Sequence, residues 1–255
     1  MKKIKIKSPE HKLLLCCSNG SFEEVLNFIN DGADVNARVP YINDKIEYWR
    51  YGARAWCRPI HLAARNPDVE ILKLLHTSGA KLAVYDFERS TPLFYAVQKN
   101  SLEVFQYLVR NGLDPHATDK YGYNLLYYSA CNPNKDVIKE LLRHGAKLNS
   151  TVDGKAALDA ACRSGTLEDV KFLIDQGADV VQNLKQTTNI MFHKEENILY
   201  LFEWCIKQGI DLDKCLDGKC FYASWSVSSV LCNLGLKNFT MRMGHGHIGL
   251  KGEYI

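Results

Sequence analysis

A glycine-centred segment returns along the chain at an almost constant interval, and this period restricts the fold more than any other feature. The recurring glycines, each followed by Ala, Leu or Ile, are Gly32, Gly79, Gly112, Gly145, Gly177 and Gly209. Successive steps between them are 47, 33, 33, 32 and 32 residues. A period of this length marks one supersecondary unit, which buries its apolar face only by stacking on its neighbours. The sequence therefore predicts a stacked array of repeats.

Each repeat contains two apolar patterns at helical spacing, which predict a pair of short helices. In the second repeat the first helix carries Ile60 and Leu62, and the second helix carries Leu72 and Leu75. Small residues stand in the first helices where a neighbouring repeat must approach closely: Cys16, Cys17, Ala63, Ala64, Ala96, Ala130, Ala161 and Cys162. The glycine after each second helix suits the left-handed backbone conformation that ends a helix. The pattern indicates tight stacking of helix pairs.

Two consecutive repeats resemble ankyrin repeats, namely Arg58 to Leu82 and Ser90 to Asp114. Pro59 and Pro92 stand where that family has its Thr-Pro-Leu-His turn, and His61 stands at the position of its histidine. The resemblance implies an all-α ankyrin-repeat solenoid of about seven stacked helix-turn-helix units with hairpin-like fingers. It also implies that the histidine joins the hydrogen bonds of its turn.

The resemblance divides the chain into three segments. Residues 1–9 form a basic N-terminal lead, residues 10–236 form the ankyrin-repeat domain, and residues 237–255 form a glycine-rich tail. The first step between glycines is longer than the next by 14 residues, which places a long finger insertion at residues 38–58. Residues 213–236 are short and divergent, as a terminal capping repeat would be.

Ankyrin-repeat proteins usually hold another protein, with the fingers and with a concave face formed by the first helices. The long finger is rich in Tyr, Trp and Arg, a composition typical of interface cores. The residues predicted to contact a protein partner are Tyr48, Trp49, Tyr51 and Trp56 in the insertion, Phe87, Tyr121 and Tyr123 in the next two fingers, and Arg65, Lys99 and Arg163 as orienting charges on the concave face.

Three alternatives to partner contact stay open. The aromatic residues of the insertion would then cover the ends of the first two repeats. Tyr121 and Tyr123 would take part in ordinary packing between fingers. The concave face would be a solvated groove, because most exposed polar residues contribute little to binding.

Sequence motifs for catalysis are absent: there is no phosphate loop, no Gly-x-Ser-x-Gly and no His-Glu-x-x-His. We therefore expect no enzyme activity, no catalytic residues and no cofactor. Cys205, Cys215, Cys220 and Cys232 lie near one another in the sequence, but zinc ligands usually occur as pairs two to four residues apart. Buried thiols are the preferred interpretation, and an enzyme with a C-terminal metal site is the least favoured hypothesis.

Composition excludes several partner classes. Lys and Arg total 32 against 29 Asp and Glu, and this small excess predicts no nucleic-acid partner. Apolar runs are far shorter than the about 20 residues needed to cross a bilayer, so no membrane partner is expected. The odd number of cysteines, nine, and an N-terminus without an apolar stretch predict a cytoplasmic protein. No small-molecule substrate is expected either.

The leading hypothesis is thus a non-enzymatic protein-protein interaction module. A second hypothesis is a dedicated inhibitor or immunity protein, or a microbial effector, that acts on one specific protein. The sequence names neither the partner nor the biological process.

Overall fold

A computed structural model gives the structure of the 255-residue chain. It describes residues 9–38, 56–99, 101–131, 135–150, 156–186, 193–212, 215, 220–221, 240–243 and 246–249. The chain divides into an N-terminal part, residues 1–129 with 136–146, and a C-terminal part, residues 130–135 with 147–255. Each part is described below by itself.

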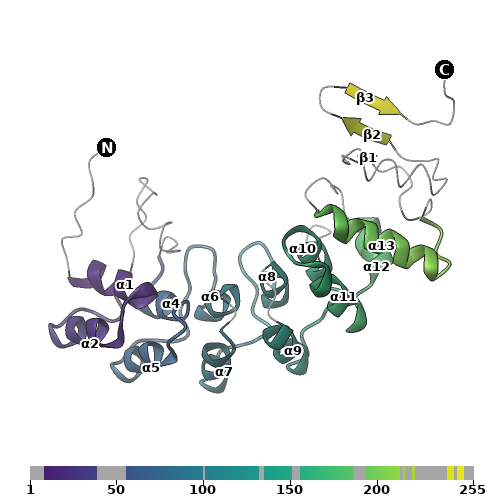
Figure 1. Cartoon of the computed structure of the whole chain (residues 1–255). Coiled ribbons are helices and arrows are strands. Elements are labelled where there is room, and N and C mark those ends of the chain that lie inside the picture. The colour runs from purple at the N-terminus through teal and green to yellow at the C-terminus, as the bar shows by residue number, and fades with distance from the viewer. Residues whose placement is uncertain are drawn as a thin grey trace. The chain divides into compact units, whose positions relative to one another are not determined.

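Helix pairs make up the N-terminal part. The pairs are α1 (Pro9–Asn19) with α2 (Phe22–Asn30), α4 (Pro59–Ala63) with α5 (Val69–Thr77), α6 (Pro92–Gln98) with α7 (Leu102–Arg110), and α8 (Leu125–Cys131) with α9 (Lys135–Arg143). Figure 1 shows the first helices of the pairs in one row and the second helices in another row beneath them. Neighbouring pairs are in contact in both rows, α4 with α1 and α6, and α5 with α2 and α7. The predicted stacked helical repeats are confirmed.

Small side chains lie where the first helices meet. Cys17, Ala63, Ala64 and Ala96 are fully buried, as the sequence pattern predicts. The second helices bury larger residues, among them Leu72. An alanine or cysteine at the contact lets two helix backbones approach closely, and the burial of the remaining apolar surface then stabilises the stack.

The predicted helix-ending glycines all have a left-handed backbone. Their φ angles are +83° at Gly32, +93° at Gly79, +92° at Gly112, +82° at Gly145, +96° at Gly177 and +70° at Gly209. At this backbone geometry a Cβ atom is strained, whereas glycine adopts it without steric cost. These glycines turn the chain out of each second helix into the next loop.

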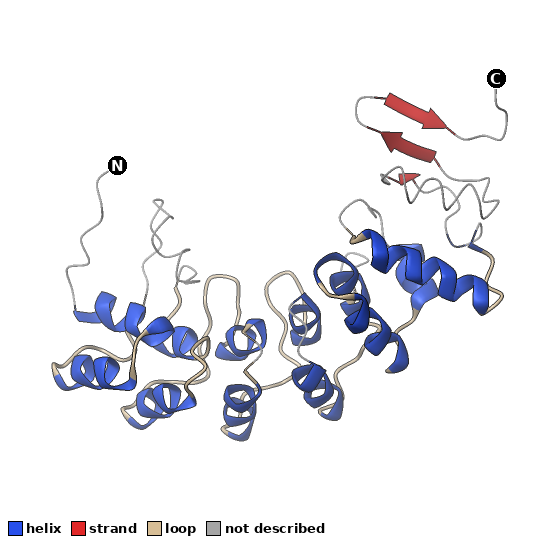
Figure 2. Cartoon of the chain, viewed as in Figure 1, coloured by secondary structure: helices blue, strands red, loops and turns tan. Residues whose placement is uncertain are grey.

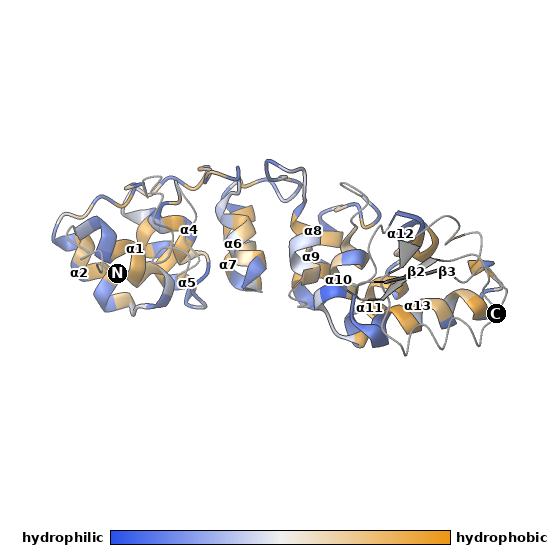
Figure 3. Cartoon of the chain, turned by 90° about the horizontal axis from the view of Figure 1, so that it is seen from above, coloured by the Kyte–Doolittle hydropathy of each residue, from blue (hydrophilic) through white to orange (hydrophobic). Residues whose placement is uncertain are grey.

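The loops that follow α2, α5 and α7 lie at the same end of the helices in the N-terminal part (Figure 3). The loops before α6 and α8 extend beyond the helices on one side, as fingers do (Figure 2). The bridge between Thr118 and Asn124 closes the second of these loops as a short hairpin. The helix stack thus presents successive fingers along one margin.

The C-terminal part contains α10 (Ala157–Ser164), α11 (Leu167–Asp175), α12 (Val180–Gln186) and α13 (Glu195–Lys207). The repeat pattern predicts a finger after Gly177, but α12 begins there instead. The Asp179 side chain explains the helix, because its Oδ1 accepts the Gln182 N–H at 2.8 Å as an N-terminal cap. No described helix, of which the 13-residue α13 is the longest, has the length and apolarity to span a membrane.

A small sheet follows the helices in the sequence. It consists of β1 (Cys220–Phe221), β2 (Thr240–Met243) and β3 (Gly246–Gly249), in the order β1-β2-β3. β1 pairs parallel with β2, and β2 pairs antiparallel with β3, with Thr240 opposite Gly249. The sequence analysis did not predict these strands, because segments of two to four residues are too short for a reliable alternation pattern. The all-α prediction therefore holds for the described repeats and not for this segment.

The glycine conformation generates a stability prediction. Gly79→Ala should lower the free energy of unfolding by about 1 kcal/mol, because alanine is strained at a φ of +93°. No atom lies within 4 Å of an added Cβ, so steric overlap contributes nothing to this loss. Gly79→Asn should lower the free energy of unfolding by less than Gly79→Ala does, since asparagine tolerates the left-handed region. Urea unfolding measures both, and a Gly79→Ala protein as stable as the parent would contradict the assignment.

Candidate protein-binding surface

Aromatic and cationic side chains lie in contact with one another across three successive loops of the N-terminal part. We call Arg38, Trp56, Phe87, Lys120 and Tyr121 the finger row. The Arg38 guanidinium lies 4.4 Å from the centre of the Trp56 ring. The Trp56 and Phe87 rings meet edge to face at 5.1 Å. Lys120 Nζ lies 4.1 Å from the centre of the Phe87 ring and 4.8 Å from that of Tyr121. The five side chains therefore form one continuous row.

The aromatic members of the finger row are exposed to solvent. The exposed fraction is 37% for Trp56, 40% for Phe87 and 54% for Tyr121. Contiguous exposed aromatic residues are uncommon on protein surfaces and typical of binding sites. The structure thus brings together three of the residues predicted to contact a partner.

The other predicted aromatic contacts fall elsewhere. Tyr123 is half-buried and stacks on Tyr127 of α8 with ring centres 4.5 Å apart, so it packs on the helix that follows its own finger and not on another finger. Tyr48, Trp49 and Tyr51 lie outside the described residues. Their role as contacts stays a prediction.

A buried aspartate fixes each of the two finger tips that follow the insertion. Asp86 Oδ1 accepts the N–H groups of Glu88 and Ser90, both at 2.8 Å, and its Oδ2 accepts the Tyr95 hydroxyl at 2.8 Å. One oxygen therefore closes the turn and the other ties the turn to α6. We call this arrangement an Asp–Tyr clamp.

The next finger has the same clamp. Asp119 Oδ1 accepts the N–H groups of Tyr121 and Tyr123 at 2.8 and 2.9 Å, and Oδ2 accepts the Tyr128 hydroxyl at 2.7 Å. Phe87 and Lys120 directly follow the two aspartates, so the clamps hold the tips that carry the finger row. Sequence reasoning missed the clamps, although the spacing of nine residues between Asp and Tyr occurs in both repeats.

Two non-glycine residues among the described ones have a positive φ, and both lie in the loops that carry the finger row. The φ angle is +66° at Trp56 and +58° at Arg89. Such angles are rare for bulky side chains and cost backbone free energy, and they occur preferentially at functional sites. Arg89 has a signal in the sequence, since it stands 33 residues before Gly122, whereas Trp56 has none.

The three predicted orienting charges have different surroundings. Arg65 is half-buried, and its Nη1 lies 3.5 Å from Gln98 Oε1. Lys99 is exposed at the end of α6. Arg163 belongs to the C-terminal part, where its Nε lies 2.9 Å from the carboxylate of the buried Asp159. The charge of Arg163 therefore has an internal counterion, while the charge of Lys99 faces solvent.

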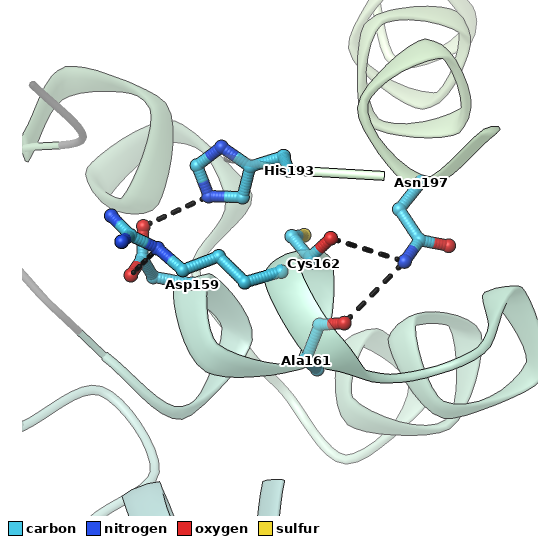
Figure 4. A network of polar contacts seen from close by, with 6 residues as sticks. Asp159, Ala161, Cys162, His193 and Asn197 are labelled. Atoms are coloured by element: carbon cyan, nitrogen blue, oxygen red, sulfur yellow. Dashed lines mark hydrogen bonds and ion pairs between the residues drawn. The ribbon is translucent and has the colours of Figure 1, made fainter. Parts of the chain in front are cut away.

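Through its ion pair with Asp159, Arg163 belongs to a buried polar network around α10, and Figure 4 shows Asp159, His193 and Asn197 of this network. His193 Nε2 lies 3.0 Å from Asp159 Oδ1, and both side chains are almost fully buried. Burial alone would raise the pKa of Asp159, but the hydrogen bond from His193 and the charges of His193 and Arg163 outweigh it and lower that pKa. Asn197 adds hydrogen bonds to the carbonyls of Ala161 and Cys162. Through His193 and Asn197, the network attaches the start of α13 and the residues before it to α10.

His61 has the structural role that the resemblance implies. The side chain is fully buried, and its Nδ1 accepts the Arg58 N–H at 3.0 Å, across the turn that opens α4. Burial, with a smaller contribution from the Arg58 charge, lowers the pKa of His61 to about 3. The imidazole is therefore neutral at neutral pH and acts as a turn acceptor.

The C-terminal cysteines are described only in part. Cys205 and Cys215 are buried, and burial together with the neighbouring Cys215 raises the pKa of the Cys205 thiol to about 12. Within the described residues no group of three or more His, Cys, Asp or Glu side chains could hold a metal ion. Cys232 and the side chain of Cys220 lie outside them.

Comparison with known proteins finds the same kind of repeat. A family model described as ankyrin repeats (3 copies) matches residues 13–119 and 93–183. The B-cell lymphoma 3 protein homolog of Mus musculus is 31% identical over 147 residues, 55% of this chain and 33% of the mouse protein. The neurogenic locus notch homolog protein 1 of Xenopus laevis is 28% identical over 183 residues, 70% of this chain and 7% of the frog protein.

A further relative is named as an enzyme. The L-asparaginase of Dirofilaria immitis is 31% identical over 121 residues, which cover 47% of this chain and 20% of the nematode protein. This chain spans a third of the length of the mouse protein and less of the other two. The similarity concerns one region of each relative, and no activity of a whole relative follows from it.

The clamp geometry predicts a local effect on the fingers. Tyr128→Phe removes only the hydroxyl that donates to Asp119, which should lower the free energy of unfolding by about 1 to 2 kcal/mol. Amide exchange at Tyr121 and Tyr123 should accelerate, because their shared acceptor loses its anchor on α8. Hydrogen–deuterium exchange measures this change.

Tyr107→Phe is the matched control for the clamp. It deletes a hydroxyl that bonds His76 Nδ1 at 2.7 Å on the second helices, away from the fingers. Exchange at Tyr121 and Tyr123 should keep the parent rate in this variant. Acceleration in both variants, or in neither, would refute the clamp.

The lowered pKa of His61 predicts loss of stability in acid. Below pH about 6.5 the unfolded chain binds a proton at this residue, whereas the folded chain binds it only near pH 3. The contribution of His61 is therefore fully present above pH about 6.5 and is lost as the pH falls from there toward about 3. Between pH about 7 and about 5 the free energy of unfolding should fall by about 2 kcal/mol from this residue.

His61→Gln supplies the control, since glutamine does not titrate. Urea unfolding of both proteins at the two pH values isolates the contribution of the imidazole. An equal loss of stability in the parent and the variant would show that protonation of His61 is not the cause of the loss.

Proposed function

The chain belongs to the ankyrin-repeat family, and on this premise we propose that it is a non-enzymatic binding protein that holds a protein partner with its finger row. Ankyrin repeats are protein-interaction modules and are generally not enzymes. In this proposal the fingers make the contact, together with the face formed by the first helices.

The observation that carries the proposal is the exposed, continuous finger row. Trp56, Phe87 and Tyr121 expose 37%, 40% and 54% of their surface. Aromatic residues at the centre of an interface typically supply most of its binding free energy. A row that crosses three loops fits a protein surface better than the enclosed pocket that a small molecule requires.

The Asp–Tyr clamps give the finger loops a fixed shape, which favours binding of a partner by these loops. The Asp–Tyr clamps at Asp86 and Asp119 hold the tips before any partner arrives. A preorganised surface loses less conformational entropy on binding, so more of the contact free energy appears as affinity. The clamps therefore support a binding role for the finger tips.

The remaining predicted residues extend the proposed contact. Tyr48, Trp49 and Tyr51 belong to the same long finger as Trp56 and would add anchors beside it. Lys99 and Arg65 would orient an acidic region of the partner by long-range attraction. Arg163, which pairs with Asp159, would contribute less. No nucleic acid, membrane or small-molecule partner is proposed.

A capture experiment tests the proposal. The parent chain and the triple variant Trp56→Ala, Phe87→Ala, Tyr121→Ala are immobilised and exposed to extract of the native cells, and bound proteins are quantified by mass spectrometry. The proposal expects a partner whose recovery falls more than about tenfold in the variant, because buried aromatic anchors are worth about 2 kcal/mol or more each.

Phe22→Ala is the matched control, because Phe22 is 37% exposed on α2 and lies outside the finger row. It should capture the partner as the parent does. Urea unfolding verifies that the triple variant is folded. If parent and triple variant recover the same proteins in equal amounts, the finger row is not the contact.

A further inference from the structure

We propose that the finger row recognises an acidic, extended peptide segment of its partner, and that Arg89 is a specificity-determining residue for this segment. The inference rests on the proposed function and adds the chemistry of the ligand. It depends on three observations: the charge of the finger tips, the backbone at Arg89 and the way in which cations cover the rings.

The finger tips present uncompensated positive charge. Arg38, Arg89 and Lys120 are exposed, and none of them makes an ion pair with another described residue. The carboxylates of Asp86 and Asp119 are buried and bonded internally, so they offer nothing to a ligand. Acidic side chains are therefore the complementary ligand.

The backbone singles out Arg89. Its φ of +58° is left-handed, and at the corresponding position 33 residues later the next finger has Gly122, with a φ of +86°. Glycine is the residue that this turn accommodates without strain, so an arginine here is unfavourable for the fold. A strained residue with an exposed, unpaired guanidinium is typical of a residue that acts on a ligand.

The dimensions of the row indicate an extended segment. Three neighbouring fingers at a helix spacing of about 10 Å span about 20 to 25 Å. An extended chain advances about 3.3 Å per residue, so about seven residues cover that length. Carboxylates on such a segment would meet the cations, and an apolar side chain would contact the ring edges.

Single-stranded nucleic acid is the competing ligand, since it also binds surfaces with alternating aromatic and cationic residues. Base stacking requires free ring faces. Here Arg38 lies over the face of Trp56 at 4.4 Å, and Lys120 lies over Phe87 at 4.1 Å. Because the protein's own cations already cover one face of each of these rings, an acidic peptide fits better than a base.

Fluorescence anisotropy of the full chain tests the inference with three labelled probes. The first is a peptide of about ten residues made of Asp and Glu around a central Leu and Phe, the second has Asn and Gln in place of the acids, and the third is an oligothymidylate of about ten nucleotides. The acidic peptide should bind at least about tenfold more tightly than the other two. Its affinity should fall severalfold as salt rises from about 0.05 to about 0.5 M.

Arg89→Gly separates recognition from folding. The variant should be at least as stable as the parent, since glycine relieves the strained turn, and it should bind the acidic peptide about two- to fivefold more weakly. Arg110→Gln, which alters an exposed arginine at the end of α7, should leave the affinity unchanged. Unchanged binding by Arg89→Gly would overturn the role of Arg89.

The remaining outcomes distinguish this inference from the proposed function. Equal or tighter binding of the oligothymidylate, equal binding of the neutral peptide, or no binding of the acidic peptide would each overturn the acidic-ligand inference. The proposed function would still stand if the triple variant failed to capture its protein partner. Normal capture by the triple variant would overturn the proposed function itself.

Discussion

Close contact between neighbouring helix pairs is the constraint on which the rest of the N-terminal part depends. A pair such as α4 and α5 cannot bury its apolar face alone, so it is stable only against the pairs on either side. Fully buried Ala63, Ala64 and Ala96 keep the first helices near one another. The spacing of the helices in turn sets the spacing of the loops, and hence the positions of the side chains in the finger row.

Hydrogen bonds to buried carboxylates give the fingers their shape. Asp86 and Asp119 each accept three hydrogen bonds from within their loop and from the following helix. The charged acceptors strengthen these bonds, and the tyrosine hydroxyls link each turn to a helix that is already fixed by stacking. The stacked helices therefore hold the finger tips in place through these hydrogen bonds.

The repeated features were predictable from the sequence because each of them has a single physical cause. Gly79 and its counterparts require a left-handed backbone, and Ala63 and its counterparts require close packing, so a period alone identifies them. Trp56, Phe87 and Tyr121 were predicted to contact a partner, which requires that they be exposed. In the structure they are exposed and lie in one row.

The features that sequence reasoning missed depend on contacts between residues far apart in the chain or on a single backbone angle. Nothing in the sequence shows that Arg38 lies over Trp56, and the φ of Arg89 is evident only once Arg89 is aligned with Gly122 of the next finger. The helix α12 replaces a finger because a local cap at Asp179 competes with the repeat pattern. The Asp–Tyr spacing was visible, but its meaning required the fold.

Each clamp is confined to one finger and to the helix that follows it. Exchanging the tip residues between Asp86 and Ser90 would leave the carboxylate and Tyr95 in place, and the loop beside it would keep its own acceptor, Asp119. Binding preference in such a scaffold can diversify through one loop at a time while the helical framework is inherited unchanged. The binding residues of each finger tip are in this sense independent of the residues that hold the helices together.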